Sequence, residues 1–264
     1  MIPKVSIVMS IYKERDSFLR NSIKSVLGQT FSDFELIIVD DGMTESNIKA
    51  LKEFSDPRVK ILKNSINLGL TKSLNKGIKQ ARGLYIARLD SDDWIAKERL
   101  AVQFKFLDEN HGYVLCGTNH HEKASDKLVE AKTPFVTGDE NLRRSLSSFN
   151  PFAHSSLLFR KSTFNEIHGY DESFDCAQDF DLIVKLSQKG KIENIDKVLT
   201  FRNVGHENIS SRKNKKQVYN SLFPRFRSLF LYGGNLKTVG YFVKSFTVLL
   251  LPTSLTKMIR KALA

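Results

Sequence analysis

The stretch LYIARLDSDDW, residues 84–94, decides the fold and points to the site. An apolar, strand-like run ends in the polar segment 90–93, in which three of four residues are aspartates. Carboxylates this close repel one another, and burying them costs free energy unless another group compensates their charge. A strand that ends in such a cluster therefore predicts a site that uses negative charge.

Strands and helices alternate along the chain before and after this stretch. Apolar runs at 4–12, 34–42, 58–63 and 84–90 predict strands, and helical spacing of apolar residues at 17–29, 44–55 and 69–82 predicts the helices between them. Thr44 is a candidate N-cap. We expect an α/β fold with an open, mainly parallel sheet flanked by helices. Further segments follow the same rules, namely a helix at about 97–110, a strand at 113–117, a polar stretch at 118–140, a strand running into a helix at 155–167, and a helix at 176–190.

A second strand, FELIIVDDG at 34–42, also ends in two aspartates. In open α/β sheets, ligands bind beyond the carboxyl ends of the strands, so parallel strands would bring both acidic clusters to one edge. Carboxylates there can hold Mg²⁺ or Mn²⁺, which often bridge protein carboxylates to substrate phosphates. An acidic turn with a helix cap is the simpler alternative for an Asp-x-Asp pattern alone.

Composition excludes several protein classes. The 264 residues are 41% hydrophobic and 27% charged, as in a soluble globular protein of one or two domains. Two cysteines, Cys116 and Cys176, are too few for a disulfide framework and suit reduced thiols in the cytoplasm. The apolar run at 5–11 lacks a cleavage site and is typical of a strand rather than a secretory signal.

Positive charge is concentrated in the last quarter of the chain. Of the formal net charge of +12, nearly all lies in residues 202–264, which hold 12 Lys and Arg and one acidic residue. Such a block favours an anionic partner, either a membrane surface or a nucleic acid; a solvated basic face is the alternative.

The tail has apolar segments that are too short to cross a bilayer. The run at 238–251 is interrupted by Lys244 and ended by Pro252, and residues 254–264 have an interfacial amphipathic pattern. We expect a helical, basic extension at 211–264 that associates peripherally with the inner, anionic face of the cytoplasmic membrane. Packing on the protein itself, or a homodimer surface at 211–250, is the alternative.

Five segments resemble family 2 glycosyltransferases, in the order that family has them. They are VSIVMSIYKE, FELIIVDDGMTE, NLGLTKSLNKGIKQARGLYIARLDSDDW, GYDESFDCAQDFDLIVKL and FRNVGHENIS, within residues 3–210. The resemblance implies a GT-A nucleotide-sugar-binding and catalytic domain at 1–210. It also implies inverting, metal-dependent transfer of a sugar from a UDP-sugar to a hydroxyl group of an acceptor. We expect that acceptor to be a lipid-linked saccharide in surface polysaccharide or O-antigen biosynthesis.

The resemblance assigns roles to individual residues. Asp40 would accept a hydrogen bond from the base of the donor, because an ionised carboxylate only accepts. Lys72, if it is not simply solvated, and Arg88 would offset phosphate charge. The residues implied in nucleotide-sugar binding are Ser10, Ile11, Tyr12, Glu14, Asp40, Asn67, Gly69, Lys72, Arg88, Asp90 and Ser91.

By the same resemblance, Asp92 would bind the Mn²⁺ or Mg²⁺ ion, and Asp179 would be the general base. Asp93 would either cap the following helix or hold a sugar. Asp181 is a second candidate base, although its separation of two residues from Asp179 predicts a different side of the helix. The sequence has Gln178 where the family usually has Glu, which removes a charge beside the base.

The other candidates would contact the acceptor or the donor sugar. Trp94 could instead pack beneath the loop, and Arg202 could contact either the donor diphosphate or an acceptor phosphate. The two histidines are of a kind that is more often structural. These candidates are Asp93, Trp94, His154, Gln178, Arg202 and His206. Met43 stands where the family commonly has small hydroxyl residues, so that contact is expected to be missing.

Three other functions fit parts of the sequence. A sugar nucleotidyltransferase would use a glycine-rich phosphate loop after the first strand, and SIYKERD contains no glycine. A nucleic-acid-binding protein would explain the basic tail but not the acidic strand ends, so we expect no nucleic-acid partner. An inactive relative would not need Asp90, Asp92 and Asp179.

Overall fold

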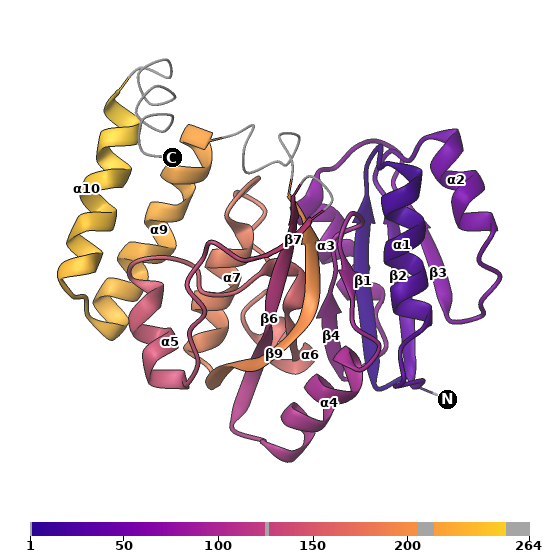
Figure 1. The fold of residues 1–264 in the computed structure, drawn as a ribbon, viewed down its shortest axis with the longest axis horizontal. Coiled ribbons are helices and arrows are strands. Elements are labelled where there is room, and N and C mark those ends of the chain that lie inside the picture. Colours follow the sequence, from indigo (N-terminus) through magenta and orange to yellow (C-terminus); the bar gives the residue numbers. More distant parts are fainter. Residues whose placement is uncertain (1, 125–126, 205–213, 252–264) are drawn as a thin grey trace.

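The computed structural model describes residues 2–124, 127–204 and 214–251 (Figure 1). The first half of the chain alternates as the sequence predicts: β1 (Val5–Ile11), α1 (Asp16–Leu27), β2 (Phe34–Asp40), α2 (Glu45–Lys52), β3 (Val59–Lys63), α3 (Leu70–Gln80) and β4 (Tyr85–Arg88). Thr44 caps α2, since its side chain accepts a hydrogen bond from the backbone N–H of Asn47.

The second half adds antiparallel strands and more helices. Its elements are β5 (Trp94–Ile95), α4 (Arg99–Glu109), β6 (Tyr113–Ala124), β7 (Lys127–Glu130), α5 (Asp139–Leu146), the short 3₁₀ helix η1 (His154–Ser156), β8 (Leu158–Arg160), α6 (Lys161–Glu166), α7 (Gln178–Ser187), β9 (Lys191–Asn203), α9 (Asn214–Tyr232) and α10 (Leu236–Leu250).

One sheet connects these strands in the order β3-β2-β1-β4-β8-β6-β9-β5, with β7 paired to β6. β3, β2, β1 and β4 are parallel, and β8 pairs with β4 in the antiparallel direction. The predicted α/β class is therefore confirmed, and its parallel part is the half that carries both acidic strand ends. β5, β7 and β9 were not expected, and β6 continues seven residues beyond the predicted strand because the polar stretch pairs with β9.

Alternating side chains on the strands build a hydrophobic core on each face of the sheet. On β1, Val5, Ile7 and Met9 face the core beneath α1 and α4, whereas Val8 faces the core beneath α3 and α7. Both cores are fully buried at their centres. Both cysteines are buried, as the sequence predicts.

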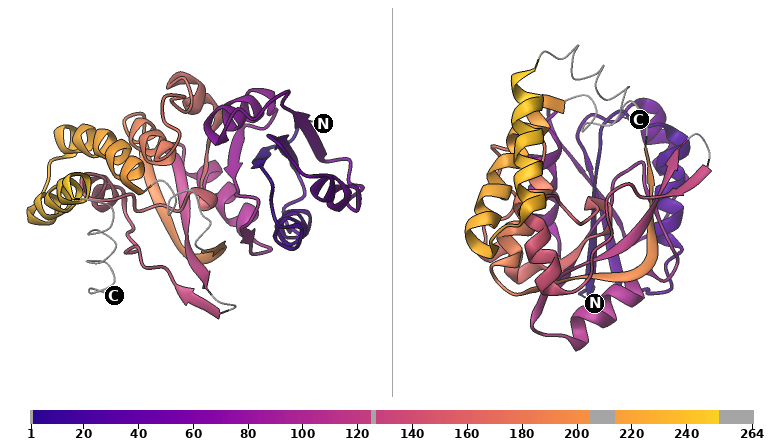
Figure 2. Two further views of the ribbon diagram at one scale, coloured as in Figure 1. Left: turned by 90° about the horizontal axis from the view of Figure 1, so that it is seen from above. Right: turned by 60° about the vertical axis from the view of Figure 1, so that its left-hand side comes forward.

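The helices α9 and α10 form an antiparallel hairpin at the end of the sheet farthest from β3 (Figures 1 and 2). α9 packs on α5 and α7, and Thr238 of α10 hydrogen bonds to Ser147 and Ser148. Within the described ranges, no helix has both the length and the apolar character needed to cross a membrane. The predicted amphipathic segment at 254–264 lies outside the described residues.

Candidate active site

Both acidic strand ends lie at one edge of the sheet, as predicted. β1 and β2 run in register so that Ile11 pairs with Asp40, and Val8 of β1 pairs with Arg88 of β4. The segments that follow these three strands, 12–14, 41–43 and 89–93, therefore leave the sheet on the same side. This edge is where an open α/β sheet binds its ligands.

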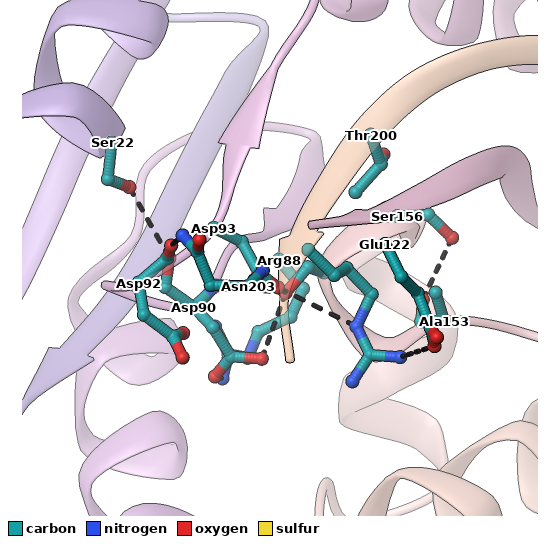
Figure 3. Close-up of polar contacts among 12 residues, drawn as sticks. Ser22, Arg88, Asp90, Asp92, Asp93, Glu122, Ala153, Ser156, Thr200 and Asn203 are labelled. Atoms are coloured by element: carbon teal, nitrogen blue, oxygen red, sulfur yellow. Dashed lines mark hydrogen bonds and ion pairs between the residues drawn. The ribbon is translucent and has the colours of Figure 1, made fainter. Parts of the chain in front are cut away.

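Figure 3 shows the acidic loop after β4, where Asp90 lies beside Arg88 and Asp93 lies beside Asn203. Ser155 of η1 holds this loop. Its Oγ lies 2.9 Å from Oδ2 of Asp90 and 2.5 Å from Oδ2 of Asp93. Arg88, which is 1% exposed, forms an ion pair with Asp90. Burial alone would raise the pKa of Asp90, but Arg88, His154, Ser155 and Arg202 together outweigh burial and hold that pKa well below the usual value. Arg88 therefore acts on Asp90 from within the protein.

Asp93 joins the acidic loop to the long strand β9. Its Oδ1 accepts a hydrogen bond from the backbone N–H of Asn203 at 2.9 Å, and its Oδ2 lies 3.8 Å from Nε of Arg202. The helix-cap prediction for Asp93 is wrong, because α4 begins only at Arg99 and Glu98 stands at its N-cap. At 3% exposure, Asp93 reaches solvent poorly, and its carboxylate has three partners inside the protein.

The carboxylate of Asp92 has different surroundings from those of Asp90 and Asp93. Asn203 binds its backbone carbonyl, but no side chain in the described part of the molecule donates to its carboxylate. Burial, and then the nearby charges of Asp93, Asp90 and Glu14, raise the pKa of Asp92 to about 9. Excess negative charge of this kind is what a divalent cation would neutralise.

The residues present fit a divalent cation held mainly through one protein carboxylate. Mg²⁺ commonly binds through one or two carboxylates, substrate phosphates and water, rather than in a cage made only of protein. Among the described residues, no group of three or more His, Cys, Asp or Glu side chains converges on one point. The carboxylate of Asp92 is therefore the available ligand on this edge.

The end of β2 contains two aspartates with different tasks. Oδ1 of Asp40 accepts the backbone N–H groups of Gly42 and Met43, at 3.0 and 2.7 Å. Asp41 faces the other way: its carboxylate accepts the backbone N–H groups of Leu68 and Gly69, at 2.7 and 2.9 Å. Asp41 thereby fixes the loop before α3, where Gly69 has a φ of 83° that favours glycine.

No role was predicted from the sequence for Asp41, Asn150, Ser155 or Asn203, although each one positions a candidate site residue. The doubled aspartate at 40–41 was a usable signal, because successive residues at a strand end point to opposite faces. The other three are contacts between distant segments, which no local pattern reveals.

The remaining nucleotide-side candidates differ in exposure. Tyr12 is 52% exposed and Ile11 is fully buried, so only the backbone of Ile11 is available to a ligand. Glu14 accepts a hydrogen bond from Ser91 at 2.9 Å, which connects the first strand end to the acidic loop. Lys72 is exposed on the first turn of α3.

Contacts of two other candidates place them among the supporting residues. Asn67 donates a hydrogen bond to the backbone carbonyl of Asp41 at 3.0 Å. Met43 lines an apolar pocket beside α2, together with Ile38 and Leu51. Asp40 lines the same pocket.

Asp179 lies in the first turn of α7, whose N-cap Ala177 has a left-handed φ of 61°. Nδ2 of Asn150 donates to its Oδ2 at 2.9 Å. Burial raises the pKa of Asp179, and the charges of Arg202 and Asp90 also act on it. Asp179 is therefore within electrostatic range of Asp90, which belongs to the same acidic loop as the candidate metal ligand Asp92.

Asp181 faces another side of α7, as the sequence predicts. It is 4% exposed and pairs with Arg227 of α9 at 3.2 Å and with Lys185 at 3.6 Å. These contacts hold the C-terminal hairpin on α7, so they leave Asp179 as the carboxylate directed to the site.

His154 is within electrostatic range of Asp90, and Gln178 directly precedes Asp179 on α7. Nε2 of His154 is 2.7 Å from the hydroxyl of Tyr170. Burial, and then the charge of Arg88, keep the pKa of His154 well below its usual value, so its ring is neutral at pH 7. Gln178 is buried, and its Oε1 has no hydrogen-bond partner among the described residues.

Trp94 stacks on Phe201, with ring centroids 5.4 Å apart and an interplanar angle of 10°. One face of the indole is therefore covered by protein, as in the packing alternative. Arg202 lies 3.8 Å from Asp93 and 3.9 Å from Glu122, so it stands between two carboxylates. His206 lies outside the described residues.

The sequence profile described as Glycosyl transferase family 2 matches residues 6–167, which hold both acidic strand ends and Ser155. The chain belongs to glycosyltransferase family 2. It is a glycosyltransferase, which agrees with the resemblance that the sequence segments indicated and sets aside the nucleotidyltransferase and nucleic-acid-binding alternatives.

Family 2 relatives share much of the chain. It is 30% identical over 223 residues to an uncharacterised glycosyltransferase of Methanocaldococcus jannaschii, covering 82% of this chain and 77% of the relative. It is 32% identical over 178 residues to the putative glycosyltransferase EpsE of Bacillus subtilis, covering 64% of this chain and 60% of EpsE.

The fold also matches a solved structure. TarS of S. aureus in complex with UDP-GlcNAc superposes with a TM-score of 0.67 and 19% identity, covering 87% of this chain and 73% of that chain. The predicted GT-A type of fold is confirmed by this match. At such low identity, the match supports the fold and not the substrate.

Proposed function

We propose that this glycosyltransferase transfers a sugar from a UDP-sugar to a hydroxyl group of a saccharide, with inversion at the anomeric carbon and with a divalent cation. The observation that carries the proposal is the pairing of Asp92 with Asp179. The first is a carboxyl group at the end of β4 whose ionisation is opposed by burial and by neighbouring carboxylates, and the second is a buried carboxylate within electrostatic range of Asp90 in the same loop.

The donor would lie across the ends of β1, β2 and β4. The proposed pocket combines Asp40 for the base, the 67–72 segment for the nucleoside and diphosphate, and Asp90 with Ser91 on the ribose side. TarS, whose fold is similar, binds UDP and UDP-GlcNAc, and this supports a uridine nucleotide as the donor class. Mn²⁺ or Mg²⁺ at Asp92 would stabilise the charge that develops on the leaving diphosphate.

Asp179 would accept the proton of the acceptor hydroxyl as that oxygen attacks the anomeric carbon. A bond then forms between the acceptor oxygen and the anomeric carbon, while the bond from that carbon to the diphosphate oxygen breaks. Attack from the face opposite the diphosphate inverts the anomeric configuration. Asn150 holds one oxygen of the Asp179 carboxylate, so the orientation of the base is fixed before the acceptor binds.

The acceptor in this proposal is a lipid-linked saccharide used in surface polysaccharide or O-antigen assembly at the inner face of the cytoplasmic membrane. The concentration of basic residues after 201 supports that location, since anionic lipids attract such segments. Arg202 is within electrostatic range of Asp179, and so is Tyr170, which is hydrogen bonded to the neutral His154; in this proposal these residues would contact the acceptor.

The test measures UDP release and sugar transfer across a panel of UDP-sugars with Mn²⁺ or Mg²⁺. Asp179→Asn should keep UDP binding and lose transfer by a factor of about 10²–10⁴. Asp92→Asn should lose metal-dependent UDP binding. The exposed Asp196 provides a matched control, since Asp196→Asn should behave as wild type. Transfer by Asp179→Asn at the wild-type rate would show that the base is misassigned.

A further inference from the structure

The outer face of α10 is apolar and open to solvent. Its exposed apolar residues recur every three or four positions and, at 3.6 residues per turn, fall within an arc of about 80°. They are Leu236, Val239, Val243, Phe246 and Leu250. Leu236 and Leu250 are 87% and 83% exposed. Nothing in the described part of the chain covers this stripe, and exposed apolar patches of this kind commonly mark an interaction surface.

α9 carries a second stripe beside the first. Tyr219, Phe223, Phe226 and Phe230 follow one another at helical spacing on a single face, and Phe230 is 87% exposed. Phe226 contacts Phe242 of α10, with ring centroids 4.6 Å apart. This contact joins the two stripes into one surface on the outside of the hairpin, which lies at the end of the molecule (Figure 1).

The charge of the hairpin has one sign. Residues 214–251 contain six Lys and Arg and no Asp or Glu. Lys237 and Lys244, both exposed, stand two turns apart on another side of α10, about 120–140° around the helix from the centre of the apolar stripe. No described carboxylate pairs with them. The next 13 residues, 252–264, add three basic residues and again no acidic one. A helix with one apolar face and a basic polar face suits the surface of an anionic bilayer.

A second copy of the chain would fit this surface less well. A two-fold dimer places the same patch on both subunits, so two hairpins that carry only positive charge would be brought together. The hairpin offers no acidic residue to compensate this positive charge. Anionic lipid headgroups supply negative charge, and acyl chains accept the apolar side chains.

We propose that the joined apolar stripes of α9 and α10, with Lys237 and Lys244, are the surface by which this enzyme lies on an anionic membrane. The hairpin is held rigidly to the catalytic helix, because Arg227 pairs with Asp181 and Asn220 donates to the backbone carbonyl of Cys176 at 3.1 Å. Membrane contact would therefore fix the orientation of Asp179 relative to the bilayer. This orienting role rests on the proposed lipid-linked acceptor, whereas the binding of the hairpin to the membrane does not.

The test is co-sedimentation of the full chain with vesicles of phosphatidylcholine alone, or mixed with phosphatidylglycerol. Wild type should pellet with the mixed vesicles and be released by salt. The pair Leu236→Ser with Val243→Ser should lower the partition coefficient at least tenfold, because inserted apolar area is lost. The pair Lys237→Ala with Lys244→Ala should weaken binding to mixed vesicles roughly tenfold or more, and leave phosphatidylcholine binding unchanged.

Matched controls lie just before the first residues of β1 and β4, away from the hairpin. Leu84→Ser and Lys4→Ala also change exposed residues and should bind as wild type does. The inference is overturned if wild type ignores anionic vesicles, or if the hairpin pairs bind like the controls. It is also overturned if analytical ultracentrifugation shows a lipid-free dimer that the Leu236/Val243 pair dissociates while vesicle binding is unchanged. UDP release without lipid tests the proposed function separately and should be equal in all variants.

Discussion

Asn150 donates a hydrogen bond from Nδ2 to Oδ2 of Asp179, at 2.9 Å. The amide is itself oriented, since its Oδ1 accepts the backbone N–H of Phe152 at 3.0 Å. The segment before η1 therefore reaches across to the first turn of α7 and fixes one oxygen of the proposed base. This contact assigns Asn150 a positioning role.

Asn150→Ala should lower kcat about tenfold and leave the KM for the donor near its wild-type value. The base would remain, but its carboxylate would sample orientations that cannot take the acceptor proton. Steady-state kinetics with varied UDP-sugar would show the effect. A matched loss of kcat and rise of donor KM would instead place Asn150 in donor binding.

The pH dependence of kcat should reflect the buried position of Asp179. Burial raises the pKa of this carboxyl above the usual aspartate value, and the base works only when deprotonated. Activity should therefore fall at a higher pH than an ordinary aspartate would give, as pH decreases through the raised pKa. Asn150→Asp adds a like charge and should move this acid limb further upward. If the limb stays in place in that variant, Asp179 does not control it.

Asp41→Asn should disorder the loop that carries two nucleotide-side candidates. Asp41 accepts three hydrogen bonds, including the Gly69 N–H, and an amide nitrogen cannot accept one. Losing a charged, buried acceptor should cost about 1.5–3 kcal/mol of stability. Thermal unfolding and titration with UDP would both shift, and Asp33→Asn on the exposed surface is the matched control. A normal melting curve with normal UDP affinity would contradict the assigned role.

The sequence predicted the parallel half of the fold because its strands are short apolar runs between helices of clear period. It could not predict β9, where KIENIDKVLTFRN mixes polar and apolar residues and pairs with the equally polar end of β6. Pairing between distant segments decides such strands, and local propensity carries little of that information.

Local sequence was equally insufficient to assign roles to the carboxylates of the candidate active site. Adjacent aspartates at 40–41 and 92–93 are chemically identical, and only their partners separate them. Asp41 and Asp93 accept backbone N–H groups from segments 27 and 110 residues away, and so hold loops together. The carboxyl group of Asp92 has no such partner in the described part of the chain, and burial together with the neighbouring carboxylates raises its pKa. A motif gives the position of a carboxylate cluster, but the contacts with distant backbone divide the roles within it.

Glu35 should control acid stability from the far end of β2. The side chain is 2% exposed, and it lies 2.8 Å from Nζ of Lys60 and 2.7 Å from Oγ of Ser6. Burial would raise its pKa, but Lys60, Arg82 and Ser6 outweigh burial and lower the pKa to about 2. The folded state therefore holds this group ionised more strongly than the unfolded chain does, where its pKa is about 4.3.

Because the folded-state pKa is the lower one, the stability from Glu35 is complete above about pH 4.3 and is lost as the pH falls toward 2. Glu35→Gln should cost about 1.5–3 kcal/mol at pH 7, and the loss should shrink between pH 5 and pH 2. Denaturant unfolding across that range measures both effects. Glu53→Gln, which breaks an exposed pair with Arg20, should follow wild type at every pH. A Glu35→Gln curve parallel to wild type down to pH 2 would mean that the buried carboxyl is not ionised in the folded protein.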